Sequence, residues 1–245
     1  MRQLIVGNWK MNGGLEAAGI MAAELAAAAP ALDCDLVVCP PFTLIYPLVQ
    51  ALAAAPIAVG AQDCHQATTG AFTGEVSAPM LADVGARYVI VGHSERREYQ
   101  QETSALVRSK TEAVLLAGLI PLICVGESEK QRRAGFEMET VGKQLAESLP
   151  DNFVGVVSYE PIWAIGTGLT ARPADVASMH DFIRERLVAR FGDNGARTRL
   201  LYGGSVKPGN AAELLAIGSV NGALVGGASL VAADFLGIAR AARKG

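Results

Sequence analysis

Residues 102–125 read ETSALVRSKTEAVLLAGLIPLICV and contain a helix-forming segment followed directly by a strand-forming one. Apolar residues recur with helical spacing as far as Gly118, and glycine commonly ends helices. Residues 120–125, which follow shortly after, form an uninterrupted apolar run. Such a run, without polar alternation, is typical of a strand in a parallel sheet that is covered on both faces. The stretch therefore predicts a helix over 102–118 and a buried parallel strand after it.

The same alternation continues along the whole chain. Strand-like runs lie at 4–7, 36–39, 57–61, 88–92, 120–125, 153–159, 200–203 and 223–226. Helical patterns lie near 15–29, 42–54, 77–85, 102–118, 130–148, 174–191, 208–217 and 234–243. Eight strands alternating with helices in 245 residues predict an α/β fold, a single closed (β/α)8 barrel with eight parallel strands and one domain over residues 1–245.

An open, doubly wound sheet is the alternative architecture. Residues 166–171 match the dinucleotide-binding pattern G-x-G-x-x-A and follow a strand-like run. In that site the first glycine stands in the tight turn that leaves the strand, whereas residues 161–165 intervene here. The match is therefore weak, and the barrel is the favoured prediction.

Composition and charge exclude several classes of protein. Hydrophobic residues make up 51% of the chain, which excludes a disordered or fibrous protein. The net charge is −3, from 21 Lys and Arg against 24 Asp and Glu, and nucleic acid is not an expected partner because its phosphates require a basic face. The uncharged stretches 36–62 and 214–233 are broken by prolines and glycines, so neither predicts a membrane span.

The cysteines and histidines give no metal-binding pattern. Four cysteines stand at 34, 39, 64 and 124 without a Cys-x-x-Cys pair, and the chain has three histidines. No zinc spacing results, and a disulfide scaffold would be denser in cysteine. The N-terminus has no apolar segment ending in a cleavage site. We therefore expect reduced thiols, no metal site and a cytoplasmic location.

Polar residues and glycines follow the predicted strands at the points where the strands end. In a (β/α)8 barrel these positions meet at one mouth, where catalytic residues are found. They include Lys10 after the first strand, His93 after the fourth and Glu160 after the sixth. Diglycines follow the last two strands, at 203–204 and 226–227. A cation, a histidine, a carboxylate and two diglycines are thus predicted to share one site.

Glu160 is predicted to act as a general base. It ends an apolar strand and precedes Pro161, which keeps it extended. The apolar segment 162–165 can cover it and exclude water, which predicts raised basicity. Glycines at 166 and 168 supply the flexibility of a moving flap, so residues 161–168 are predicted to form a lid. An outward-facing glutamate in a salt bridge is the alternative interpretation.

His93 precedes a segment, 94–97, that looks like the start of a helix. The positive helix end disfavours imidazolium, so a neutral ring that donates a hydrogen bond is predicted. With Lys10 it would stabilise a developing enediolate oxygen while Glu160 abstracts a proton next to a carbonyl. The alternatives are a core histidine bonded to backbone and an ordinary surface lysine.

The diglycines predict a phosphate site. Loops after strands seven and eight commonly bind phosphate in barrels, and glycines let backbone N–H groups approach its oxygens. Ser205 adds a hydroxyl. Turn formation alone explains a diglycine equally well. Two further functions therefore stay open beside proton abstraction next to a carbonyl: an oxidoreductase using residues 166–171, and a non-catalytic anion-binding module.

Five segments resemble the triosephosphate isomerase family. They are NWKMN at 8–12, GHSER at 92–96, YEPIWAIGTG at 159–168, YGGSV at 202–206 and VGGAS at 225–229. They stand in the family's order and span practically the whole chain. The resemblance implies a TIM barrel that interconverts dihydroxyacetone phosphate and D-glyceraldehyde 3-phosphate in glycolysis and gluconeogenesis, without a cofactor.

The resemblance also implies residue roles. By position in the motifs, Glu160 is similar to the family's proton acceptor, His93 to its electrophile and Lys10 to its active-site cation. Asn8 is similar to a substrate-contacting asparagine and Glu95 to a supporting carboxylate. The residues similar to the family's phosphate-binding residues are Gly166, Ser205, Gly226 and Gly227. It further implies a homodimer through the loop 62–77, with Thr73 reaching toward the other active site. Two departures are visible: Leu169 where lysine is frequent, and Asp63 where asparagine is common.

Overall fold

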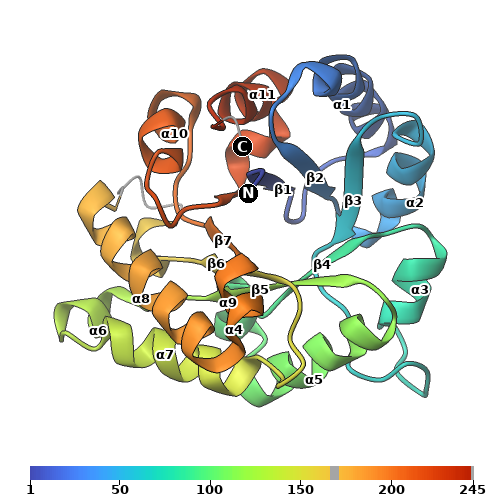
Figure 1. Cartoon of the computed structure of the whole chain (residues 1–245). Helices are drawn as coiled ribbons and strands as arrows, with labels where there is room; N and C mark the ends of the chain where they lie inside the picture. Colours follow the sequence, from blue (N-terminus) through green and yellow to red (C-terminus); the bar gives the residue numbers. More distant parts are fainter. Residues whose placement is uncertain (166–170, 244–245) are drawn as a thin grey trace.

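The computed structural model of the chain describes residues 1–165 and 171–243, and its eight strands close into a barrel in chain order (Figure 1). Every neighbouring pair of strands is parallel, including β1 with β8. The strands are β1 Leu4–Asn8, β2 Asp35–Cys39, β3 Ile57–Ala61, β4 Tyr88–Val91, β5 Ile120–Val125, β6 Val156–Tyr159, β7 Arg199–Tyr202 and β8 Gly222–Val225. The predicted (β/α)8 barrel is confirmed, and the open sheet is wrong.

Helices surround the strands on the outside of the barrel (Figure 1). They are α1 Leu15–Ala28, α2 Phe42–Ala51, α3 Ala78–Asp83, α4 Ser94–Tyr99, α5 Ser104–Leu116, α6 Glu129–Arg133, α7 Glu137–Ser148, α8 Pro173–Phe191, α9 Asp193–Arg197, α10 Pro208–Leu215 and α11 Ala232–Arg240. The described residues also form three short 3-10 turns: η1 Ala29–Ala31 after α1, η2 Ile162–Ala164 after β6 and η3 Gly227–Leu230 after β8. Within the described ranges, no helix has the length and apolarity needed to cross a membrane.

The single helix predicted over 130–148 is wrong, because the chain ends α6 and starts α7 at Gly135. Gly135 has a φ of +76°, a left-handed conformation that glycine adopts at low cost. Its N–H donates to Arg132 O at 3.0 Å, and the Phe136 N–H donates to Gln131 O at 2.9 Å. These two bonds form a Schellman motif, which closes a helix. The predicted strand 153–159 is likewise shorter and begins at Val156.

Two apolar cores lie on opposite sides of the strands. Side chains inside the barrel form the smaller core, which includes Leu4, Val6, Leu122 and Leu224. The larger core contains the intervening Ile5 and lies between the strands and the helices. Successive strand residues therefore face opposite cores, as the two-residue period of a strand requires.

The inward-facing positions of the strands continue beyond the apolar core to one mouth of the barrel. The next inward positions are Asn8 after Leu4 and Val6, Glu160 after Val156 and Ser158, Gly203 after Leu201, and Gly226 after Leu224. The two-residue period of the strands therefore places polar residues and glycines on the floor of a single cavity.

Candidate active site

The cavity at the carboxyl ends of the strands has a volume of about 210 Å³. Most of the predicted site residues line it, from the ends of five different strands: Asn8, Lys10, His93, Glu160, Ser205, Gly226 and Gly227. Gly203, Gly204, Lys207 and Ile165 complete much of its wall. The structure therefore brings the predicted carboxylate, histidine, cation and diglycines together.

Glu160 is held at the floor of this cavity by two neighbours. Its side chain is only 2% exposed, so an outward-facing surface glutamate is excluded. The Ser94 N–H, in the first turn of α4, donates to Oε2 at 2.9 Å. His93 Nε2 lies 3.0 Å from Oε1. A buried carboxylate is stable only when its charge is compensated, and these contacts compensate it.

His93 has its two ring nitrogens in different environments. Nδ1 accepts the Glu95 N–H at 3.2 Å, at the start of α4. This contact leaves the ring proton on Nε2, the nitrogen that faces Glu160 and the cavity. The interpretation as a core histidine bonded only to backbone is therefore wrong. His93 is oriented by the helix N-terminus and presents Nε2 to the site.

The pKa directions of this pair differ from the sequence-based prediction. Burial raises the pKa of Glu160, but His93 and the Ser94 N–H lower it by more, so the net pKa is below the usual value. Burial lowers the pKa of His93, but the Glu160 and Glu95 carboxylates outweigh it and raise the net pKa. Both pKa shifts are therefore opposite in direction to the sequence-based prediction for the arrangement without substrate, because each group stabilises the charged form of the other.

Lys10 follows β1 in an unusual backbone conformation. Its φ is +52°, which is strained for a residue with a side chain. The Asn8 side chain accepts the Lys10 N–H at 3.1 Å, and Gln62 Nε2 donates to Lys10 O at 2.9 Å. The ammonium group forms an ion pair with Glu95. These contacts hold the lysine against the cavity, so a freely solvated surface lysine is excluded.

Packing does not require glycine at either position of the diglycine 226–227, although the Gly226 backbone, with φ −84° and ψ −114°, lies outside the main regions for residues with a Cβ. Neither residue has a positive φ. A Cβ on Gly227 would meet no atom within 4 Å, and one on Gly226 would meet only Lys10 Cε at 3.6 Å. Because glycine has no side chain, the cavity has open space at these two positions, and the backbone faces that space. An incoming ligand could approach this backbone closely, which a tight turn alone does not require.

The first part of the predicted lid is anchored at both sides. Trp163 Nε1 donates to Glu127 Oε1 at 2.9 Å, and the Ile162 N–H donates to Glu127 O at 3.1 Å. Ser205 Oγ donates to Ala164 O at 3.0 Å. Gly166, Leu169 and the remainder of the segment 166–170 lie outside the described residues. Lid anchoring therefore depends on Glu127, a completely buried carboxylate.

Two predicted residues lie away from the cavity wall, and several contributors were missed. Glu95 lines an adjoining groove and contacts the site through Lys10 and His93. Thr73 is exposed on the loop between β3 and α3. Ser94 and Gln62 were not predicted as site residues. Their positions immediately after strand ends are the sequence signal that could have identified them.

Comparison with known proteins agrees with this geometry. Residues 3–242 match the family model described as Triosephosphate isomerase. The chain is 56% identical to triosephosphate isomerase from Granulibacter bethesdensis, over 98% of this chain and 99% of that protein. It is 56% identical to the enzyme from Rhodopseudomonas palustris, over 98% and 97% of the two chains.

A solved structure gives the same result. The crystal structure of triosephosphate isomerase from Bartonella henselae superposes with a TM-score of 0.92 at 45% sequence identity, covering 98% of this chain and 99% of that one. The resemblance carried by the five sequence motifs is thereby confirmed. The chain belongs to the triosephosphate isomerase family.

Proposed function

We propose that this chain interconverts dihydroxyacetone phosphate and D-glyceraldehyde 3-phosphate by a cofactor-free proton transfer in which Glu160 is the base. Membership of the family supports an isomerase of glycolysis. The observation that carries the proposal is the cavity where Glu160, His93 and Lys10 face open glycine backbone. That combination suits a small phosphorylated carbonyl compound.

In this reaction Glu160 removes a proton from the carbon next to the carbonyl group and returns it to the neighbouring carbon. His93 donates a hydrogen bond from Nε2 to the carbonyl oxygen, and the Lys10 ammonium stabilises the negative charge that develops there. Because Nε2 faces Glu160 at 3.0 Å without substrate, the carboxylate has to move away from the ring when substrate binds. Burial then dominates the His93 pKa and lowers it, which favours the neutral donor.

The phosphate group of the substrate is assigned to the opposite side of the cavity. Gly226, Gly227 and Ser205 line that side, and η3 begins at Gly227. Backbone N–H groups at open glycines bind phosphate oxygens without a basic side chain. This arrangement explains how a protein with a net charge of −3 can hold an anionic substrate.

Shortening the proposed base tests the assignment. Glu160→Asp keeps the charge but withdraws the carboxylate by one methylene, and a misplacement near 1 Å costs about 10²-fold in rate. We expect kcat to fall about 10²-fold, measured in both reaction directions. Glu112→Asp is the matched control, because Glu112 pairs with Arg108 on the outer surface of α5. A Glu160→Asp variant within threefold of the parent would contradict the role of the base.

We also propose a homodimer formed through the loop 62–77. This loop leaves the barrel between β3 and α3 (Figure 1), and its Phe72 is 45% exposed. A groove beside the active site is bordered by exposed apolar side chains, among them Met11, Phe42 and Tyr99. A second copy's loop fits such a groove, with its Thr73 directed toward the site.

Light scattering of the parent and of Phe72→Glu tests this: the parent should have the mass of a dimer and the variant that of a monomer.

We assign the protein to the cytoplasm. All four cysteines are buried and unpaired, as expected in a reducing compartment. Burial raises the pKa of the Cys34 thiol to about 11 and that of Cys64 to about 12, so neither is reactive near neutral pH.

A further inference from the structure

The chain turns sharply between the end of β4 and the start of α4, and a glycine makes this turn. Gly92 has a φ of +66°, in the left-handed region that a residue with a Cβ rarely adopts. A Cβ at this position would also stand 2.7 Å from Val107 Cγ2. His93 follows directly as the N-cap of α4. The direction of the His93 side chain therefore depends on how this turn is held.

Arg97 holds the turn from the side of the helix. Its Nε donates to Gly92 O at 2.8 Å, and its backbone N–H donates to His93 O at 3.0 Å. One residue is thus bonded to the carbonyl groups of two consecutive residues of the turn. Because glycine has access to many backbone conformations, such bonds are needed to keep the turn in the observed one.

The rest of the Arg97 guanidinium group joins the turn to other elements of the barrel. Nη2 donates to Cys124 O in β5 at 3.2 Å and to Ser148 Oγ at the end of α7 at 3.1 Å. Nη1 donates to Ser104 Oγ at the start of α5 at 3.2 Å. A guanidinium group can bond several acceptors at once because its N–H donors point in fixed directions. The turn is therefore tied to one strand and two helices by a single side chain.

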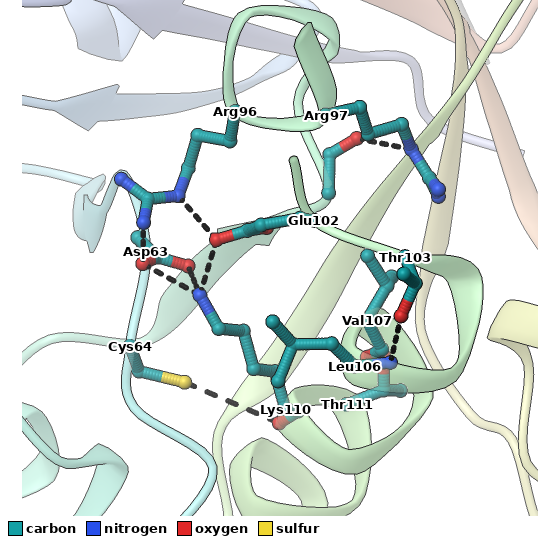
Figure 2. A network of polar contacts seen from close by, with 11 residues as sticks. Asp63, Cys64, Arg96, Arg97, Glu102, Thr103, Leu106, Val107, Lys110 and Thr111 are labelled. Atoms are coloured by element: carbon teal, nitrogen blue, oxygen red, sulfur yellow. Dashed lines mark hydrogen bonds and ion pairs between the residues drawn. The ribbon is translucent and has the colours of Figure 1, made fainter. Parts of the chain in front are cut away.

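Arg97 differs from its neighbour Arg96 in the kind of partner that it has. Figure 2 shows the two side chains pointing away from each other, and Arg96 forms ion pairs with Asp63 at 2.8 Å and Glu102 at 2.7 Å. The acceptors of the Arg97 side chain named above are all neutral oxygens. Burial lowers the pKa of Arg97, and the Glu160 carboxylate is among the groups that oppose this shift. A cation held by neutral oxygens gains little from charge pairing, so the bonds themselves are its evident role.

The turn that Arg97 holds carries two contacts to the proposed base. His93 Nε2 lies 3.0 Å from Glu160 Oε1, and the Ser94 N–H donates to Oε2 at 2.9 Å. Arg97 itself is not part of the cavity wall that the described residues form. Its effect on the site therefore passes through the backbone of the turn.

We propose that Arg97 is a positioning residue for His93: it fixes the turn 92–94 to β5, α5 and α7, and so keeps His93 Nε2 directed into the cavity. The inference rests on the proposed function, in which His93 donates a hydrogen bond to the carbonyl oxygen of the substrate. Arg97 makes no contact with the substrate.

Arg97→Met tests the inference, because methionine keeps an unbranched stem and removes every side-chain donor. A misplacement near 1 Å costs about 10²-fold, so we expect kcat to fall about 10- to 100-fold while KM stays within about threefold of the parent. Arg190→Met is the matched control. Arg190 also donates to carbonyl groups near the end of α7, Ala146 O at 3.0 Å and Leu149 O at 2.9 Å, but it does not touch the turn. It should leave kcat within about twofold of the parent.

A double-mutant cycle separates positioning from a general loss of structure. If Arg97 acts through His93, Arg97→Met should cost less than about threefold in a His93→Gln background, because the side chain that it positions is gone. An equal loss in both backgrounds would overturn the proposal. So would an Arg97→Met protein that unfolds at lower temperature but keeps the kcat of the parent.

Nuclear magnetic resonance of the protein with 15N-labelled histidine reads the environment of the His93 ring without turnover. The His93 signals are those that His93→Gln lacks. We expect them to move in Arg97→Met and to stay in place in Arg190→Met, because the contact of Nε2 with Glu160 depends on the turn. Unmoved His93 signals in Arg97→Met would overturn the inference.

Arg97→Lys keeps the charge and decides the question if Arg97→Met does not fold. An ammonium group on a flexible stem cannot reproduce the planar donor pattern of arginine, so kcat should still fall by about 10-fold or more and the His93 signals should still move. An Arg97→Lys enzyme with the kcat of the parent would overturn the inference. A parent without isomerase activity would refute the proposed function, and the histidine signals would then still show whether Arg97 positions the ring.

Discussion

Gly203→Ala is the substitution for which the structure gives the most direct prediction of a catalytic effect. Gly203 is the last of the inward-facing positions that begin in β7, and it lies beside Glu160 in the cavity wall. Its φ is not positive, so it does not adopt the left-handed conformation that favours glycine. A Cβ at this position would stand 2.8 Å from Glu160 Cγ and 2.6 Å from Ser158 Oγ. Glycine is therefore required here by the close approach of the proposed base.

The size of the effect follows from these distances. Nonbonded carbon atoms rest at about 3.5–4.0 Å, so Glu160 Cγ must retreat by about 0.7 Å from its 2.8 Å position. The added methyl group occupies space next to the side chain that has to move toward substrate, and a misplacement near 1 Å costs about 10²-fold, so we expect kcat to fall by about 10- to 100-fold. The added methyl group also overpacks the site, which should cost about 1–3 kcal/mol in free energy of unfolding.

Steady-state kinetics and urea unfolding test both parts of this prediction. Gly209→Ala is the matched control, because a Cβ in that position on α10 would meet no atom within 4 Å. It should leave kcat unchanged and raise the free energy of unfolding by about 0.4–1 kcal/mol. A Gly203→Ala enzyme with the kcat of the parent would show that the close approach of Gly203 to Glu160 does not matter for catalysis.

Three other substitutions test separate parts of the account. His180 is buried, and desolvation lowers its pKa from 6.5 to about 4, so the unfolded chain takes up the proton first as the pH falls. The parent should therefore lose about 2 kcal/mol of unfolding free energy between about pH 7.5 and about pH 5 that His180→Asn does not lose; equal pH dependence by urea unfolding would contradict this. Ser94→Pro removes the N–H that Glu160 accepts at a helix position that proline tolerates, which should raise the Glu160 pKa and move the acid limb of the kcat/KM profile to higher pH; an unchanged limb would refute this contact. Inorganic phosphate should compete with substrate in the parent and in Gly218→Asp but not in Gly227→Asp, and phosphate that fails to inhibit the parent would refute the phosphate site.

The barrel itself was predictable, because hydrophobic runs and helical periodicity report local burial. Residues 120–125 were predicted as a strand and form β5 with the same bounds. The break at Gly135 was missed although its cause is local, since a glycine inside a helical pattern does not by itself show whether its φ is positive. Short elements such as α9 lack enough residues for a periodic signal.

The site residues could be predicted only where the ends of the strands determine their positions. Glu160, His93 and Lys10 were placed at one mouth because parallel strands end there. The directions of the Glu160 and His93 pKa shifts were predicted wrongly, because the contact between these two residues joins the ends of β4 and β6 through space. The contact of the Ser94 N–H with Glu160 and the support of Lys10 by Gln62 were missed for the same reason. Spacing along the chain carries no information on such contacts.

Proton transfer at Glu160 is the central claim, and hydrogen exchange between substrate and solvent measures it most directly. In D2O the parent should convert D-glyceraldehyde 3-phosphate to dihydroxyacetone phosphate that carries deuterium on the carbon next to the carbonyl group, as mass spectrometry or NMR detects. Glu160→Gln, which keeps the shape of the side chain without its basicity, should lose this incorporation by about 10²–10⁴-fold. Turnover by the parent without deuterium uptake, or undiminished uptake in Glu160→Gln, would contradict the mechanism.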